Sequence, residues 1–186
     1  MEANVGRQSE YFMNHPKLSA YGEAVSAVKL CDESYDYVDC RIGYMSQEFL
    51  EIGCIQTTQG RLPEADNEVA MDARTLTKLG ITVPKLGQTI TLRYYENNDE
   101  YYDENRRTAE FVLVGVLENY TNVWNGGRNF SGALVTKECF ETFDYEGMNA
   151  YIYKLAGSER HSDHTALHEE ILSGAVWHNN SCSYCY

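Results

Sequence analysis

The sequence of 186 residues lacks the features that mark several large classes of protein. No window approaches the ~18 apolar residues of a membrane-spanning helix; the longest candidate is Val112–Leu117. The N-terminus has neither the basic start nor the apolar core of a secretory signal peptide. Taken alone, these absences indicate a cytosolic protein or a piece excised from a larger one.

Positive charge is scarce, since 15 Lys and Arg stand against 28 Asp and Glu and leave a formal net charge of −13. This balance disfavours a nucleic-acid backbone or an anionic lipid surface as partner. It allows a cationic partner, although a solvated acidic surface accounts for it as well. A hydrophobic fraction of 43% in a chain of this length is enough for the core of one domain or two small lobes.

Motifs for nucleotide binding and for serine hydrolysis are also missing. The sequence contains neither G-x-x-x-x-G-K-[ST] nor G-x-G-x-x-G, the glycine-rich loops that hold phosphates, and no G-x-S-x-G nucleophile elbow. The acidic stretch from Glu96 to Glu104 lacks the spacing and the glycine of an EF-hand loop. We therefore predict no cofactor and no catalytic residue.

Three histidines lie close together in the sequence, and two of them are spaced for one helical face. Within a predicted helix, His168 follows His164 by four positions, which places both on one face. His161 lies just before them. Zinc can be bound by histidines at this spacing. The Glu of an H-E-x-x-H helix is absent, however, and no further ligand is specified. Two interpretations stay open: a zinc-dependent enzyme and a solvated helix face.

The six cysteines are spaced too irregularly for a compact disulfide framework. Cys31 and Cys40 are near enough in sequence to close a short loop. Cys182 and Cys185 have no helical pattern after them, so the helix N-terminus that lowers a thiol pKa in a thioredoxin-like site is not predicted. The cysteines alone do not decide the cellular compartment.

Hydrophobic periodicity predicts strands and short helices interspersed along the chain. The predicted strands are Tyr37–Tyr44, Glu68–Met71, Gln88–Tyr94, Phe111–Leu117, Gly132–Thr136 and Asn149–Leu155. The predicted helices are Leu18–Leu30, Ser46–Glu51, Ala73–Leu79, Glu138–Phe143 and Asp163–Ser173. The last residues of the first of these could instead continue as a strand, and Ser46 is a candidate cap of the second. The tail from His178 onward shows no pattern.

The stretch from residue 59 to residue 92 has the densest local signals. Gly60 and Pro63 predict a turn before a short strand. Asp72 is placed to cap the following helix, and Gly80 falls where a left-handed residue ends one. Gly87 predicts a second turn, after which alternating residues form another strand.

Five motifs in this region resemble those of the extracytoplasmic core domain of MacB/FtsX-like ABC transporter permeases. In that family a G-R-x-P turn precedes an N-E-[IV] strand, a short helix ends in L-G, and a G-[DQ]-x-[IV]-x-[IVL] strand is followed by one ending in V-x-G-[IV]. All occur here in that order, and the resemblance covers about residues 40–156. The motif residues are Gly60, Arg61, Pro63, Asn67, Glu68, Gly80, Gly87 and Gly115.

The same residues have roles that can be argued physically. A turn between Arg61 and Glu68 would fold the guanidinium back onto the carboxylate and form a charge-assisted pair. Gly115 permits close backbone approach in a buried strand, and Gly87 suits a turn. These roles predict a stiff fold and no catalytic site.

The resemblance implies an α+β fold, a mixed sheet with short helices in one or two lobes. It also implies a single non-enzymatic domain over residues 1–186, excised from between transmembrane helices of a permease, with an inserted lobe at about 85–130. It implies a place on the extracellular side of the cell membrane of a Gram-positive bacterium. The implied partners are the permease's own transmembrane helices, a cytoplasmic ABC ATPase and an extracellular peptide or protein. ATP hydrolysis would then drive movement outside the membrane, for export of a peptide or lipophilic substrate or for signalling.

An acidic, Tyr-rich segment and an aromatic loop depart from the family pattern and are the predicted partner surface. Its residues are Glu96, Asp99, Glu100, Tyr101, Tyr102 and Trp124. The same surface supports an alternative, a stand-alone extracellular binding module for a cationic peptide or glycan. Salt-sensitive binding by the isolated domain would favour that alternative.

Overall fold

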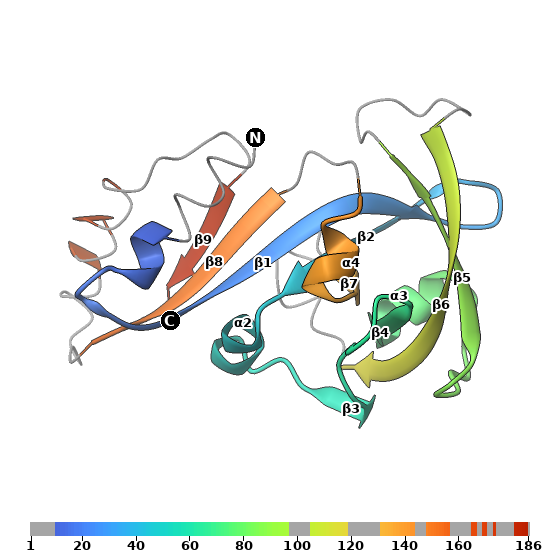
Figure 1. The fold of residues 1–186 in the computed structure, drawn as a ribbon, viewed down its shortest axis with the longest axis horizontal. Helices are drawn as coiled ribbons and strands as arrows, with labels where there is room; N and C mark the ends of the chain where they lie inside the picture. Colours follow the sequence, from blue (N-terminus) through green and yellow to red (C-terminus); the bar gives the residue numbers. More distant parts are fainter. Residues whose placement is uncertain are drawn as a thin grey trace. The chain divides into compact units, whose positions relative to one another are not determined.

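A computed structural model describes residues 10–96, 105–118, 131–143, 148–156, 165–166, 169–170, 173 and 181–185 (Figure 1). The chain forms two compact units. Unit 1 comprises Met1–Ala24, Met45–Cys54 and Met148–Tyr186, and unit 2 comprises Val25–Tyr44 and Ile55–Gly147. Among the described residues, no helix is both long and apolar enough to cross a membrane.

Unit 2 is built on a mixed sheet. Its strands are β1 (Leu18–Cys31), β2 (Tyr37–Met45), β3 (Thr57–Gly60), β4 (Glu68–Asp72), β5 (Thr89–Tyr95), β6 (Arg106–Leu117) and β7 (Ser131–Leu134). Two of these strands are shared: β1 belongs to unit 1 up to Ala24, and Met45, the last residue of β2, also belongs to unit 1. The strand order is β2-β7-β4-β6-β5-β1, and β1 also pairs with β2, so the order returns to its start. The β2–β7 and β4–β6 pairs are parallel, whereas β1–β5, β4–β7 and β5–β6 are antiparallel. β3 adds to β6.

Two short helices, α3 (Ala73–Lys78) and α4 (Lys137–Phe140), contribute to the core of unit 2. Leu76 of α3 and Phe140 of α4 are buried with apolar side chains of the strands. Along β5 the burial alternates as predicted, because Ile90 and Leu92 are buried while Thr89 is exposed. The sheet and both helices therefore share one apolar cluster.

Unit 1 contains α2 (Gln47–Ile52), β8 (Met148–Leu155) and β9 (Ser181–Cys185). β8 pairs with β1 and, in parallel, with β9. Residues 10–13 are helical, and Phe12 is buried against two rings of β8. The ring of Phe12 stacks on Tyr151 at 4.8 Å and on Tyr153 at 5.9 Å between centroids. An aromatic cluster thus holds this helical turn on the sheet.

Several features that were predicted from neighbouring residues in the sequence are confirmed. Ser46 caps α2 and Asp72 caps α3, as predicted. Gly80 follows α3 with φ of 77°, the left-handed conformation expected there. The described residues within the predicted helix 163–173 are all helical.

One prediction is wrong, and the structure decides two points that the sequence left open. Leu18–Leu30 is a strand and not a helix, because pairing of β1 with β2, β5 and β8 outweighs the helical spacing of its alanines. The tail forms β9, whose backbone bonds to β8 and needs no apolar pattern of its own. Cys31 and Cys40 are free thiols and close no loop.

Candidate functional site

The turn between β3 and β4 contains most of the motif residues and lies directly on β6. Gly60 has φ of 71°, which favours glycine. Gly60 is paired with Gly115 of β6. A Cβ on Gly60 would lie 2.0 Å from the carbonyl oxygen of Val114, and one on Gly115 would lie 2.1 Å from that of Arg61. The two glycines therefore let the backbone of the turn rest against the strand, where Arg61 N donates to Val114 O at 3.0 Å.

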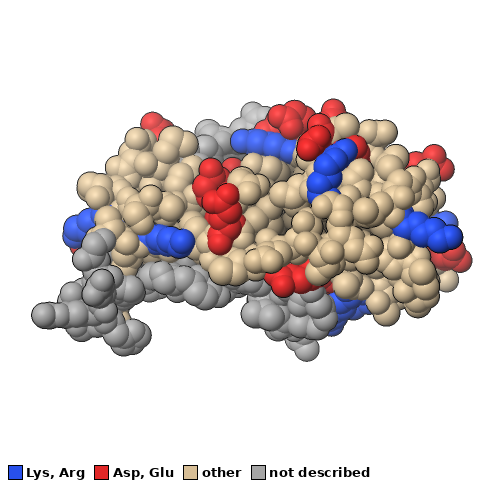
Figure 2. All heavy atoms as spheres, turned by 90° about the horizontal axis from the view of Figure 1, so that it is seen from below, with Lys and Arg blue, Asp and Glu red and all other residues tan. Residues whose placement is uncertain are grey.

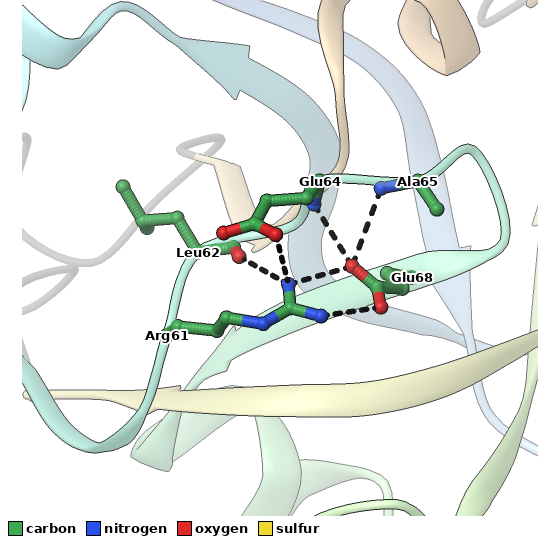
Figure 3. Close-up of polar contacts among 5 residues, drawn as sticks. All are labelled: Arg61, Leu62, Glu64, Ala65 and Glu68. Carbon is green, nitrogen blue, oxygen red and sulfur yellow. Dashed lines mark hydrogen bonds and ion pairs between the residues drawn. The ribbon is translucent and has the colours of Figure 1, made fainter.

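An ion pair closes this turn, as the seven-residue spacing predicts (Figure 3). Arg61 Nη1 and Nη2 donate to Glu68 Oε2 and Oε1, each at 2.7 Å. Glu68 Oε2 also accepts from the backbone N–H groups of Glu64 at 2.8 Å and Ala65 at 3.2 Å. Arg61 Nη1 donates in addition to Leu62 O at 2.9 Å. One carboxylate thus fixes both ends of the turn.

These bonds hold Glu68 in its ionised form. The hydrogen bond from Arg61, followed by that from the Glu64 N–H, lowers the pKa of Glu68 from 4.5 to about 2. The hydrogen bond to Glu68 raises the pKa of Arg61 in turn. Only 16% of the Glu68 side chain is exposed, against 45% for Arg61. A carboxyl group with so low a pKa has no proton to donate near neutral pH and is a weak base, and both of its oxygens already accept hydrogen bonds, so the arrangement suits a structural clamp.

Further bonds join the turn to its neighbours in unit 2. Asn67 O accepts from Val112 N of β6 at 2.8 Å. Asp66 Oδ1 accepts from the hydroxyl of Thr136 at 2.9 Å. After α3, Gly87 has φ of 84° and donates from its N–H to Leu113 O at 2.8 Å. The turn, β6 and α4 are therefore bonded into one body.

The base of the β5–β6 hairpin is described, whereas its tip is not. Glu96 N donates to Asn105 O at 3.0 Å, and Arg107 Nε lies 2.7 Å from Glu96 Oε2. Of the predicted partner surface, only Glu96 lies within the described residues, where it takes part in this ion pair. The other members lie outside them: Asp99, Glu100, Tyr101, Tyr102 and Trp124.

The histidines of the predicted zinc site, His164 and His168, also lie outside the described residues, as does His161. Within the part of the chain that the structure describes, no group of three or more His, Cys, Asp or Glu side chains is arranged to hold a metal ion. The zinc hypothesis therefore stays a prediction from spacing.

Sequence reasoning missed two features of unit 2: the helix cap at Thr136 and the positive φ of Tyr35. Thr136 was expected to end a strand, yet it caps α4 and bonds to Asp66. Tyr35 has φ of 62°, and its ring lies 4.7 Å from the guanidinium carbon of Arg106. Its hydroxyl lies 2.9 Å from that of Thr108. Threonine is a common capping residue, so the Thr directly before Lys137 could have predicted the cap. Nothing in the sequence around Tyr35, by contrast, predicts a positive φ for such a bulky residue.

Three cysteines of unit 2 have buried thiols of low reactivity. Burial raises the pKa of Cys31 and of Cys139 to about 11. Burial also raises the pKa of Cys40, whose sulfur accepts from the Thr75 hydroxyl at 3.1 Å. Since the thiolate is the reactive form, these cysteines are packing residues.

Charged side chains are mixed on the face shown in Figure 2. Acidic and basic groups lie beside one another there, with broad uncharged areas between them.

Comparisons with known proteins identify the fold. No protein-family model and no curated protein matches the chain. Among solved structures, the chain is similar to the periplasmic region of MacB from Actinobacillus actinomycetemcomitans, with 9% identity, a TM-score of 0.53, and coverage of 91% of this chain and 71% of that one. This likeness confirms the predicted α+β mixed sheet and, at the level of the fold, the predicted resemblance to the MacB-like domain.

Two further structures are similar over most of the chain. A domain of a putative permease protein from Porphyromonas gingivalis has 15% identity and a TM-score of 0.41, covering 88% of this chain and 74% of that one. The extracellular domain of the noncanonical ABC-type transporter YknZ from Gram-positive bacteria has 12% identity and a TM-score of 0.48, covering 86% and 75%.

Proposed function

We propose that the chain is the extracytoplasmic domain of an ABC transporter permease of the MacB/FtsX-like type. The observation that carries the proposal is the likeness to the periplasmic region of MacB over 91% of the chain. The order of the sequence motifs supports it independently, because they fall on the β3–β4 turn, at the end of α3, at the start of β5 and on β6, in the family's order.

The domain's role in this proposal is mechanical and non-enzymatic. A cytoplasmic ATPase would move the permease's transmembrane helices, and unit 2 would pass that movement to an extracellular peptide or protein. Two features support such a role: the Arg61–Glu68 clamp fixes the turn to the start of β4, and the Gly60–Gly115 pairing lets the turn pack closely on β6. A body that transmits force must keep its shape, and packed, hydrogen-bonded elements do so.

The proposal also places the domain on the outer side of the cytoplasmic membrane of a Gram-positive bacterium, with its parent's transmembrane helices as neighbours. The acidic hairpin after Glu96 and the loop around Trp124 are then the surface that meets the partner. The parent would export a peptide or lipophilic substrate, or signal to an extracellular protein.

The sequence flanking residues 1 and 186 in the source genome tests the proposal. We expect an apolar segment of about 18 residues on each side of this chain and an ABC ATPase encoded in the same or an adjacent reading frame. A second, biochemical test uses that full reading frame expressed in cells, with a membrane-impermeant biotin reagent applied to lysines of this domain. Labelling from outside intact cells supports the proposal, whereas labelling only after lysis, or flanks without apolar segments, contradicts it.

A further inference from the structure

One hydroxyl group links the clamped turn to α4. Thr136 Oγ1 donates to Asp66 Oδ1 at 2.9 Å and accepts from Cys139 N at 3.1 Å. The backbone of Thr136 accepts in addition from Phe140 N at 2.9 Å. The same residue therefore caps the helix and holds it to the turn that contains Arg61 and Glu68.

The turn that follows α4 packs against the β5–β6 hairpin, and Phe143 N in this turn donates to Phe140 O of the helix at 3.2 Å. The ring of Phe143 meets that of Tyr94 edge to face, with centroids 5.3 Å apart and planes at 85°. Both rings are buried in the core cluster that also contains Cys139 and Phe140. Tyr94 is paired with Arg107 across the sheet, and Arg107 forms the ion pair with Glu96 at the hairpin base. A hydrogen bond, the backbone of α4, a ring contact, a strand pairing and an ion pair thus connect Asp66 to Glu96 step by step.

We propose that α4 is a relay that couples the Arg61–Glu68 turn to the base of the β5–β6 hairpin, with Thr136 as its positioning residue. A helix of four residues has few hydrogen bonds of its own, so its cap and its packing set its position. Because the cluster beneath it is close-packed, a shift of α4 must move the Phe143 and Tyr94 rings.

The coupling is a property of unit 2 alone, and only its use in transport depends on the proposed function. A structural explanation competes with it: the Asp66–Thr136 bond is exposed, and an exposed cap can stabilise the first turn of a helix without any effect further on. The two accounts differ in what happens at the Tyr94 and Phe143 rings when Asp66 is altered.

The test uses NMR of the full 186-residue chain with Asp66→Ala and a matched control, Glu64→Ala. Glu64 lies in the same turn, but its carboxylate is 3.9 Å from Arg61 and 75% exposed. We expect Asp66→Ala to shift the ring resonances of Tyr94 and Phe143 and to make exchange of the Phe140 amide faster by about 2- to 30-fold, the range for a weakened cap. Glu64→Ala should change neither, and the ring of Tyr151 in unit 1 reports that both variants are folded.

A second pair of variants shows whether Asp66 acts through Thr136. Thr136→Ser keeps a hydroxyl and should retain the wild-type ring resonances, whereas Thr136→Val should shift them. Adding Asp66→Ala to Thr136→Val should produce no further shift, because the bond is already lost.

The relay is overturned if Asp66→Ala alters the Phe140 amide and leaves the Tyr94 and Phe143 rings unchanged, or if its effect adds to that of Thr136→Val. These outcomes concern the isolated chain, so they are separate from a failure of the proposed function. Flanks without apolar segments would remove the transport role and leave the coupling intact.

Discussion

At the scale of single residues, the Glu68 carboxylate makes stability depend on pH. Its pKa is about 2 in the folded chain against 4.5 ordinarily, so its contribution is complete above about pH 4.5 and is lost as the pH falls toward 2. We expect Glu68→Gln to lower the melting temperature by a few degrees at pH 7. The difference from wild type should shrink steadily between pH 4.5 and 2, as measured by thermal unfolding monitored by circular dichroism.

Glu64→Gln is the matched control for this experiment, because its carboxylate lies on the same turn but 3.9 Å from Arg61. It should change the melting temperature little at any pH. A Glu68→Gln difference that stays constant from pH 7 to pH 2 would show that the ion pair is not its cause.

A second residue-scale prediction concerns Gly115, where the cost is steric. Alanine at this position would place its Cβ 2.1 Å from the carbonyl oxygen of Arg61, a backbone atom that cannot rotate away. We expect Gly115→Ala to lower the free energy of unfolding by roughly 1–3 kcal/mol, the range for overpacking. Urea unfolding measures it, and Val114→Ala on the same strand should cost less, because that side chain is only half-buried. An unchanged midpoint for Gly115→Ala would refute the close contact.

At the scale of elements, the caps determine whether the short helices form. Asp72 is fully buried and accepts from Arg74 N at 2.8 Å and from Thr75 N at 3.1 Å. Replacing it with Ala should lower the free energy of unfolding by about 1–2 kcal/mol, since two N–H groups lose their partner. Asp72→Asn keeps an acceptor oxygen and should retain most of the stability in urea unfolding. Equal losses for the two variants would mean that the carboxylate charge, and not the cap, matters.

The same scale shows what the sequence could and could not reveal. Caps such as Asp72, positive-φ glycines and the alternation of β5 depend on neighbours within a few residues, so they were predictable. The Arg61–Glu68 pair was also predictable, because one turn contains both partners. β1 and β9 owe their conformation to pairing with strands far away in the sequence, and the Asp66–Thr136 bond joins residues 70 positions apart. No local pattern encodes such partners.

At the scale of the whole molecule, β1 and β2 contribute residues to both units. The two units therefore share continuous backbone through these strands. We expect loss of structure in one unit to disturb these shared strands, so that the two units unfold together in spite of their separate cores.

Phe12→Ala tests this cooperativity from unit 1. Phe12 is 1% exposed and stacked on Tyr151, so its loss should cost about 3–5 kcal/mol in the free energy of unfolding.

The readout comes from unit 2, where the buried thiols of Cys31, Cys40 and Cys139 react only when that unit opens. Thiol alkylation in increasing urea, mapped by mass spectrometry, should show all three becoming reactive at a lower urea concentration than in wild type. Met13→Ala, which truncates a 65% exposed neighbour, should leave the midpoint unchanged. If Phe12→Ala lowers the midpoint of far-ultraviolet circular dichroism while the three thiols keep their wild-type midpoint, the units unfold independently, and the continuous strands do not couple them.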